Sequence, residues 1–255
     1  MRRATFPDLQ AASVFITGGG SGIGAALTEG FLEQGAKVAF VQRSDATAFC
    51  DEMEARHGTR PLFIACDVTR IEALRAAVAE AARAHGDPTV LVNNAANDVR
   101  HETLDVTEDF WDQNQAINLK PYFFAAQAVI PGMQRAGGGR IVNFSSVSYM
   151  MGIGEYPSYA AANAAIVGLT RAQAREFGAS GIRVNALAPG WTMTQKQIDL
   201  WVTPEKYEAF LARQCLPRPI LPDDMVAPTL FLASEASAAI TGQCLPVDGG
   251  VVVTG

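Results

Sequence analysis

The run of residues 17–24, Thr-Gly-Gly-Gly-Ser-Gly-Ile-Gly, is the first segment with the composition to do chemistry. Glycines let a backbone turn sharply and approach a pyrophosphate closely, and the free N–H groups at the start of a following helix favour negative charge. A glycine-rich string on its own is equally typical of a flexible loop. Because an apolar run precedes this one and a helix-like run follows it, we expect it to bind a dinucleotide.

The residues at the end of the second expected strand indicate which dinucleotide is bound. A carboxylate there would hold a ribose 2′-hydroxyl, but Gln42, Arg43 and Ser44 stand in its place. Arg43 can pair with a 2′-phosphate and Ser44 can donate a hydrogen bond to it, although an exposed loop arginine would look the same. Asp45 follows at once and could still reach a ribose. We expect NADP to be preferred, with NAD as the alternative.

Tyr159 and Ser146 could supply the acid–base chemistry that such a cofactor needs. Oxidation of an alcohol removes a hydride, which a nicotinamide accepts, and a proton. A phenol such as Tyr159 can take the proton if it is ionised, and the Ser146 hydroxyl can hydrogen-bond the same substrate oxygen. A phenol and a hydroxyl beside a nicotinamide could therefore move the proton of an alcohol oxidation.

A regular alternation of strands and helices must position these residues. Short apolar runs, expected as strands, alternate with Ala-rich stretches of helical period, and this pattern predicts an α/β fold with a doubly wound parallel sheet and right-handed crossovers. The expected strands are 13–17, 37–41, 61–66, 89–92, 140–144, 182–187 and 245–247. The expected helices are 22–34, 45–57, 70–85, 108–133, 156–178 and 222–234, with Pro121 starting a new stretch within the fourth and Pro131 bending or ending it. We expect one Rossmann-like domain, 1–255, with a small helical substrate lid at about 191–222.

Composition excludes several classes of function. The net charge is −6 and no basic stripe is present, so nucleic acid is not an expected partner. No apolar run is long enough to span a membrane and no signal peptide is seen, so we expect a cytoplasmic protein acting on a small molecule. The four cysteines and three histidines are scattered, which predicts reduced thiols and no metal site.

Several motifs in order resemble the short-chain dehydrogenase/reductase family over nearly the whole chain. They are the glycine run, Asp67-Val68, Asn93-Asn94-Ala95-Ala96, Ile117-Asn118-Leu119, Ser146 thirteen residues before Tyr159, and Pro189-Gly190 followed by Thr192 and Thr194. Ala96 departs from the family's glycine. The resemblance implies cofactor contacts at Gly18, Ser21, Gly22, Ile23, Gly24, Gln42, Arg43, Ser44, Asp67, Val68, Asn94, Ala95, Pro189, Gly190, Thr192 and Thr194. It also implies a catalytic set of Asn118, Ser146, Tyr159 and the residue at 163.

Position 163 is where the sequence departs most from that family. The residue four positions after Tyr159 lies on the same helical face, and in the family it is a lysine that lowers the tyrosine pKa and holds the nicotinamide ribose. Here it is Asn163, which can reach a ribose hydroxyl but cannot favour a phenolate by charge. Because a free tyrosine titrates near ~10, Tyr159 would be mostly protonated at neutral pH. Three interpretations stay open: an enzyme impaired in oxidation, a carbonyl reductase that uses a protonated Tyr159, or a dinucleotide-binding pseudoenzyme.

A finer resemblance is to the sugar 1-dehydrogenases of the same family, which act on pentoses and deoxyhexoses. The stretches that carry it are Asn97-Asp98-x-Arg100-His101, Asn143-Phe144-Ser145-Ser146-x-Ser148, Trp201-x-Thr203-Pro204-Glu205 and Gln214-Cys215-Leu216. They imply oxidation of an aldose at C1 to the lactone. The candidate substrate contacts are Asn97, His101, Ser148 and Trp191, and the family's common assembly implies a homotetramer.

Overall fold

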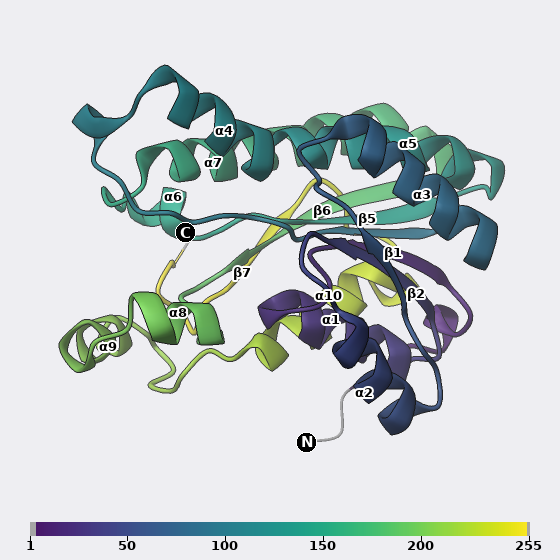
Figure 1. Cartoon of the computed structure of the whole chain (residues 1–255), viewed down its shortest axis with the longest axis horizontal. Helices are drawn as coiled ribbons and strands as arrows, with labels where there is room; N and C mark the ends of the chain where they lie inside the picture. Colours follow the sequence, from purple (N-terminus) through teal and green to yellow (C-terminus); the bar gives the residue numbers. More distant parts are fainter. Residues whose placement is uncertain (1–3, 254–255) are drawn as a thin grey trace.

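The computed structural model describes residues 4–253, and a parallel sheet of seven strands runs through the middle of it (Figure 1). The strand order is β3-β2-β1-β4-β5-β6-β7, and every paired neighbour is parallel. The strands are β1 (Ser13–Thr17), β2 (Lys37–Gln42), β3 (Leu62–Ala65), β4 (Val90–Asn93), β5 (Gly139–Phe144), β6 (Ile182–Pro189) and β7 (Cys244–Val247). The order reverses between β1 and β4, so a crevice opens beyond the carboxyl ends of these two strands, where folds of this kind bind ligands.

Helices cover both faces of the sheet, which confirms the doubly wound class (Figure 1). One layer contains α3 (Ile71–His85), α4 (Glu108–Asn118), α5 (Lys120–Arg135) and α7 (Pro157–Phe177). The other contains α1 (Gly22–Glu33), α2 (Thr47–His57) and α10 (Val226–Ala233). Three short helices, α6 (Ser148–Met151), α8 (Gln195–Leu200) and α9 (Pro204–Leu211), lie near the carboxyl ends of the strands. Within residues 4–253, no helix has both the length and the apolar character needed to cross a membrane.

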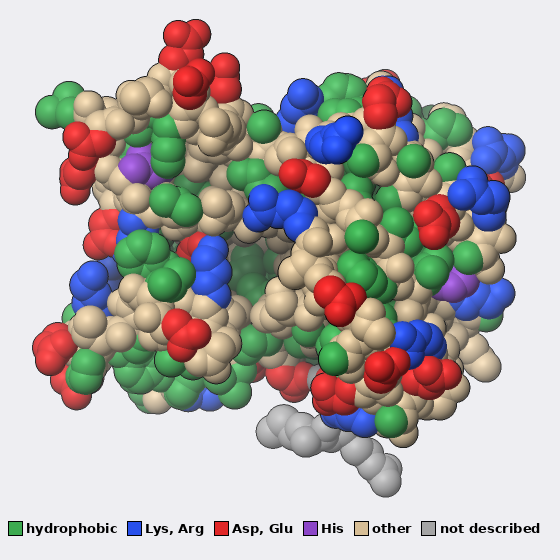
Figure 2. Space-filling model, viewed as in Figure 1, with side chains coloured by type: hydrophobic (Ala, Val, Ile, Leu, Met, Phe, Trp, Pro, Cys, Tyr) green, Lys and Arg blue, Asp and Glu red, His purple; other side chains and the backbone are tan. Residues whose placement is uncertain are grey.

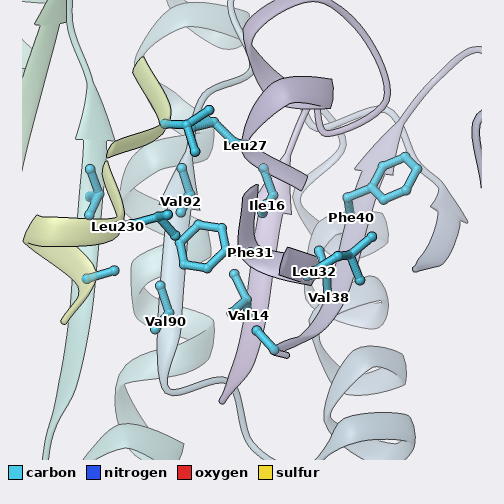
Figure 3. Close-up of a cluster of buried hydrophobic side chains, with 14 of the residues drawn as sticks. Val14, Ile16, Leu27, Phe31, Leu32, Val38, Phe40, Val90, Val92 and Leu230 are labelled. Atoms are coloured by element: carbon cyan, nitrogen blue, oxygen red, sulfur yellow. The ribbon is translucent and has the colours of Figure 1, made fainter. Parts of the chain in front are cut away.

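The apolar pattern of β1 explains why helices pack on both sides. All five of its residues are buried, and successive side chains point to opposite faces. Val14 and Ile16 join the cluster with Phe31 of α1, as Figure 3 shows, whereas Phe15 joins the cluster under α3 and α5. Burial of a side chain such as Phe31 stabilises the fold by about 1.5–3 kcal/mol.

The single helix expected over 108–133 is in fact two helices. The break is at Leu119, whose backbone (φ −129°, ψ −52°) is not helical. Pro121 lies in the first turn of α5, where a backbone N–H would have no partner within the helix, so proline costs no helical hydrogen bond there. The new stretch expected at Pro121 is therefore α5. The end expected at Pro131 does not occur, since α5 continues to Arg135.

Candidate active site

A cavity of about 1160 Å³ lies at the carboxyl ends of the strands, between the sheet and helices α8 and α9. It opens on the face in Figure 2 as a hollow with an apolar floor and Lys or Arg side chains beside it. Every residue expected to contact the cofactor lines this one cavity, as do Ser146, Tyr159, Ser148 and Trp191. Four of the other expected residues, Asn97, His101, Asn118 and Asn163, do not line it.

The glycine-rich turn forms one end of the cavity and is fixed by its own backbone. The Gly18 N–H donates to the Val41 carbonyl at 2.7 Å, which continues the pairing of β1 and β2 into the turn. A Cβ on Gly24 would lie 1.8 Å from the Gly18 carbonyl oxygen, so only glycine fits there. Gly22 has a φ of +53° and begins α1, so the amino terminus of this helix faces the cavity. The turn thus offers backbone N–H groups and a helix dipole to an anion.

The end of β4 braces this turn. The Thr17 hydroxyl accepts hydrogen bonds from the N–H groups of Asn94 (3.0 Å) and Ala95 (3.1 Å). In return, the Asn94 amide donates to the carbonyls of Thr17 (3.2 Å) and Gly18 (3.1 Å). The ends of two neighbouring strands are therefore locked together under the place where a pyrophosphate would lie.

Residues at the end of β2 shape the pocket wall that would meet a ribose. The Gln42 side chain accepts a hydrogen bond from the Gly20 N–H (3.0 Å) and donates to the Ser44 carbonyl (3.0 Å). Asp45 accepts from the backbone N–H and the hydroxyl of Thr47, and these bonds lower the pKa of its carboxyl. Its carboxylate is thus held at the start of α2, whereas Arg43 lines the cavity.

Asp67, after β3, closes the far end of this wall. Its carboxylate accepts hydrogen bonds from the Thr69 hydroxyl (2.7 Å) and N–H (3.0 Å). The pKa of Asp67 is lowered by these Thr69 bonds and, more weakly, by the positive charge of Arg43. The carboxylate is therefore ionised and fixed in orientation at neutral pH.

Tyr159 and Ser146 meet at the other end of the cavity. Tyr159 is in the first turn of α7 and Ser146 follows β5, and both residues line this end of the cavity. Burial raises the pKa of Tyr159 well above that of a free phenol, and the negative charge of Asp98 raises it further. Hydrogen bonds from Asn163 and Ser146 act in the opposite direction but do not offset the burial. The phenol is therefore protonated at neutral pH.

Asn163 lies beside the phenol but turns its amide toward its own helix. Its side chain is 3% exposed, and its Nδ2 donates to the Tyr159 backbone carbonyl at 2.9 Å. Its backbone carbonyl accepts a hydrogen bond from the Ser145 hydroxyl at 2.9 Å. The position that the family fills with an ammonium thus contributes a neutral hydrogen bond to Tyr159 and no charge.

Asn118 holds the segment that leaves β4. Its Oδ1 accepts from the Asn97 N–H (2.7 Å), and its Nδ2 donates to the Asn97 carbonyl (3.0 Å) and to Asn114 Oδ1 (3.2 Å). The Asn118 side chain thus bonds to both the N–H and the carbonyl of Asn97, as the backbone of a neighbouring strand would. The break between α4 and α5 is what lets Asn118 face that segment.

Two of the four expected substrate contacts are placed differently from the prediction. The His101 ring contacts the Ser158 hydroxyl (2.8 Å) and the Val99 carbonyl (2.9 Å), so it holds the start of α7. The Asn97 backbone is held by Asn118, and its side chain accepts from Lys196 Nζ at 3.3 Å. Neither residue lines the cavity: the His101 ring bonds to its own loop and to α7, and the Asn97 side chain bonds to Lys196 of α8. The sequence marked this loop correctly as polar but not the direction of its side chains.

Ser148 and Trp191 do line the cavity. The Ser148 hydroxyl is buried (2% exposed) and has no hydrogen-bond partner in the structure. Trp191 donates from Nε1 to Gln197 Oε1 (2.9 Å), and its ring lies edge-on to Phe210 of α9. Ser148 therefore presents an unsatisfied polar atom, whereas Trp191 is an aromatic wall held by the helices beside it.

Sequence reasoning missed Asp98, Lys196 and Arg100 as residues of this cavity. Lys196 Nζ lies 2.7 Å from the Asp98 carboxylate, across 98 positions of sequence. Arg100 lies over the rings of Tyr156 and Trp201 and pairs with Glu155. Asp98 and Arg100 stand in a stretch that carried the finer resemblance, but no local pattern indicates that they contact residues of α8 or line the cavity.

The last strand braces the segment that follows β6. The Gly190 N–H donates to the Val247 carbonyl (3.0 Å), and a Cβ on Gly190 would lie 2.8 Å from the Asp248 Cα. Asp248 in turn accepts from the N–H groups of Gly250 (2.8 Å) and Val252 (2.7 Å). The path of the chain from Pro189 into α8 is thus set by residues 244–252.

One cluster outside the cavity brings together Glu29, Glu33 and His57, residue types that can hold a metal. His57 Nε2 lies 3.1 Å from Glu29, and Arg56 pairs with the same carboxylate. Because a fixed cation already compensates this carboxylate, we assign the cluster no ligand.

Comparison with known proteins gives consistent matches over almost the full chain. A family model described as enoyl-(acyl carrier protein) reductase matches residues 18–252. A Rhizobium meliloti protein described as a probable galactose dehydrogenase is 49% identical over 96% of this chain and 97% of its own length. The D-xylose 1-dehydrogenase of Caulobacter vibrioides is 43% identical over 98% of this chain and 99% of its own. A Sinorhizobium meliloti structure, provisionally described as a short-chain alcohol dehydrogenase, superposes with a TM-score of 0.91 at 35% identity and covers 96% of this chain and 98% of that one.

Proposed function

The chain belongs to the short-chain dehydrogenase/reductase family of oxidoreductases, and from that premise we propose that it oxidises a neutral aldose at C1 to the lactone, with NADP as the preferred acceptor. The observation that carries the proposal is the single cavity that joins the glycine-rich turn to the Ser146–Tyr159 pair. The two most similar relatives named above are described as acting on galactose and on D-xylose, which supports a sugar as the substrate.

The residues at the glycine-rich end fit a dinucleotide. The close approach at Gly24 and the amino terminus of the 12-residue helix α1 leave backbone N–H groups facing the cavity. The cavity volume of about 1160 Å³ exceeds that of a typical single-ligand pocket, which suits a dinucleotide together with a sugar. Gly18, Ser21 and Gly22 would hold the pyrophosphate, and a bound nicotinamide would accept the hydride from C1.

Tyr159 and Ser146 handle the proton of the same step. The C1 hydroxyl gives its proton to the Tyr159 oxygen as the C1–H bond breaks, and the Ser146 hydroxyl hydrogen-bonds the oxygen that becomes the lactone carbonyl. Atoms balance: the sugar loses a hydride and a proton. Because this direction needs the phenolate and burial raises the pKa of Tyr159, oxidation should accelerate as pH rises above neutrality.

The end of β2 supports NADP over NAD. Gln42 replaces the carboxylate that would bind a free 2′-hydroxyl, and Arg43 lines the cavity beside it. Asp45, the residue that favoured NAD in the sequence, is bonded to Thr47 instead. A 2′-phosphate would pair with Arg43, whereas a free 2′-hydroxyl would find no carboxylate there.

The test follows NADP⁺ and NAD⁺ reduction with a panel of pentoses and hexoses between pH 6 and pH 10. We expect an aldose to be oxidised with NADP⁺, at a rate that increases with pH. Absence of oxidation of every aldose, both by the protein and by its Asn163→Lys variant, would contradict the proposal.

The raised pKa of Tyr159 supports a second candidate, a carbonyl reductase. In that direction the protonated phenol donates to the carbonyl oxygen, so no ionised tyrosine is needed. Rapid NADPH-dependent reduction of ketones at or below pH 7, without sugar oxidation at any pH, would favour this candidate over the first.

A further inference from the structure

A group of charged and polar side chains lies in the cavity apart from the catalytic pair. Asp98, in the segment after β4, accepts hydrogen bonds from Lys196 Nζ (2.7 Å) and Gln197 Nε2 (2.6 Å), both on α8. All three residues line the cavity that contains Tyr159. Neither the cofactor turn nor the proton transfer described above uses them.

Neighbouring contacts fix the orientation of this group. Lys196 Nζ also donates to Asn97 Oδ1 (3.3 Å), and Gln197 Oε1 accepts from Trp191 Nε1 (2.9 Å). The Asp98 side chain is 24% exposed. Burial opposes its ionisation, but the bonds from Lys196 and Gln197 prevail and leave the pKa of Asp98 below its ordinary value. The group is therefore an ionised, preorganised acceptor beside a donor.

The group is close to the reacting centre. After burial, the charge of Asp98 is the strongest influence on the phenol of Tyr159. The same cavity contains the unpartnered hydroxyl of Ser148 and the unpartnered Nε of Arg100, both buried atoms. Buried polar atoms without partners are uncommon in native structures, so these two indicate that a polar ligand completes the cavity.

We propose that Asp98 and Lys196 together bind a hydroxyl of the sugar other than the one oxidised, and thereby decide which aldoses are accepted. This inference deepens the proposed function and rests on it. A hydroxyl donates one hydrogen bond and accepts others, so it can donate to the Asp98 carboxylate and accept from the Lys196 ammonium. The paired charges neutralise each other, which favours an uncharged polyol over a carboxylate or phosphate at this point.

The pair also belongs to two different elements. Asp98 belongs to the segment after β4, whereas Lys196 belongs to α8, in the segment we propose as a lid. A hydroxyl that bonds to both would link the sugar to lid closure. A sugar that lacks the hydroxyl, or presents it in the opposite configuration, would leave a charged pair unmatched and be rejected.

The test compares Asp98→Asn with the protein itself, and Asp105→Asn serves as a matched control on an exposed carboxylate of the same loop region. Two quantities are measured for the best aldose and for each of its monodeoxy analogues: kcat/KM with NADP⁺, and binding to the NADP-bound protein by saturation-transfer NMR. We expect Asp98→Asn to lower kcat/KM and binding affinity 10- to 100-fold for the parent sugar but less than threefold for one deoxy analogue. NADP affinity and the Asp105→Asn values should stay unchanged, and Lys196→Met should reproduce the pattern.

Several outcomes of these measurements would overturn the inference. The first is an equal loss of kcat/KM and binding for every analogue. The second is a loss that, for both Asp98→Asn and Lys196→Met, accompanies a fall in NADP affinity or in folded content measured by circular dichroism. The third is binding of a sugar acid in preference to every neutral sugar. Sugar oxidation that is indifferent to Asp98 removes this inference and leaves the proposed function intact. Sugar binding that depends on Asp98 but leads to no oxidation would contradict the proposed function and leave this inference intact. Absence of any sugar binding would contradict both.

Discussion

The two ends of the cavity are built by different kinds of contact. At the cofactor end, backbone groups and side chains bonded to backbone connect the ends of adjacent strands, as Thr17 and Asn94 do. At the substrate end, side chains bond to side chains over long stretches of sequence, as Asp98 and Lys196 do. The first construction is fixed by sheet pairing; the second depends on where a short helix comes to rest. We therefore expect the first end to tolerate fewer substitutions than the second.

Tyr159→Phe should have the largest effect, because it should reduce catalysis without affecting cofactor binding. Phenylalanine keeps the ring packed against Tyr156 but removes the atom that takes the proton. Because acid–base groups contribute about 10²–10⁴-fold, we expect kcat for sugar oxidation to fall by about 10³ while NADP affinity stays unchanged. Initial-rate kinetics and NADPH fluorescence titration measure the two quantities, and a parallel fall in NADPH affinity would refute the separation.

Gly24→Ala should have the converse effect. The new Cβ would meet the Gly18 carbonyl at 1.8 Å, so the turn must shift away from the position that receives the pyrophosphate. We expect NADPH affinity to fall by roughly 10² or more, because the backbone N–H groups no longer converge. Gly154→Ala is the matched control, since a Cβ there meets nothing within 4 Å. Equal NADPH affinities for the two variants would show that the close approach is unimportant.

Asn163→Lys should sharpen the comparison by changing the proton chemistry at Tyr159. An ammonium near the phenol favours the phenolate and lowers the pKa of Tyr159, so the rise of oxidation with pH should move to lower pH. Each unit of that displacement is tenfold in phenolate, and we expect a 10- to 100-fold faster oxidation at pH 7. Asn163→Met, neutral and of similar length, should not reproduce it; identical pH–rate profiles for lysine and methionine would exclude a charge effect.

Arg43→Ala should have the smallest effect and only on the cofactor end. Loss of the guanidinium removes the partner of a 2′-phosphate, so NADP affinity should fall by about tenfold with NAD affinity unchanged. Calorimetric titration with both dinucleotides decides this. An equal loss for both would place Arg43 at the pyrophosphate or adenine instead of the 2′-position.

The sequence was sufficient for most of the sheet, because apolar runs and glycines are local signals. The resemblance implied cofactor contacts at Gly22, Asn94 and Thr194, and the structure places all three in the lining of one cavity. Pro121 indicated that a new stretch starts inside the long helix, and α5 does begin there, whereas the end suggested by Pro131 does not occur because α5 continues to Arg135. The position of the last residue of α4 is less local, since Asn118 bonds to the distant Asn97.

The substrate end was predicted less well for a physical reason. His101 and Asn97 have side chains that could bind a sugar. In the structure, however, the His101 ring bonds to Ser158 of α7 and the Asn97 side chain bonds to Lys196 of α8. Asp98 lies between them and faces the cavity instead. Side-chain direction in an irregular segment depends on partners almost a hundred residues away, which composition and spacing do not encode.

The brace formed by residues 244–252 has a consequence for how the protein is made. Synthesis proceeds from the amino terminus, and the glycine-rich turn leaves the ribosome more than two hundred residues before this brace. Early strands and helices can form as they emerge, whereas the path from Gly190 into α8 has no support until Val247 and Asp248 arrive. A nascent chain would therefore form its glycine-rich turn well before the wall of the cavity at Gly190 and α8, which becomes supported only once residues 247–248 have been synthesised.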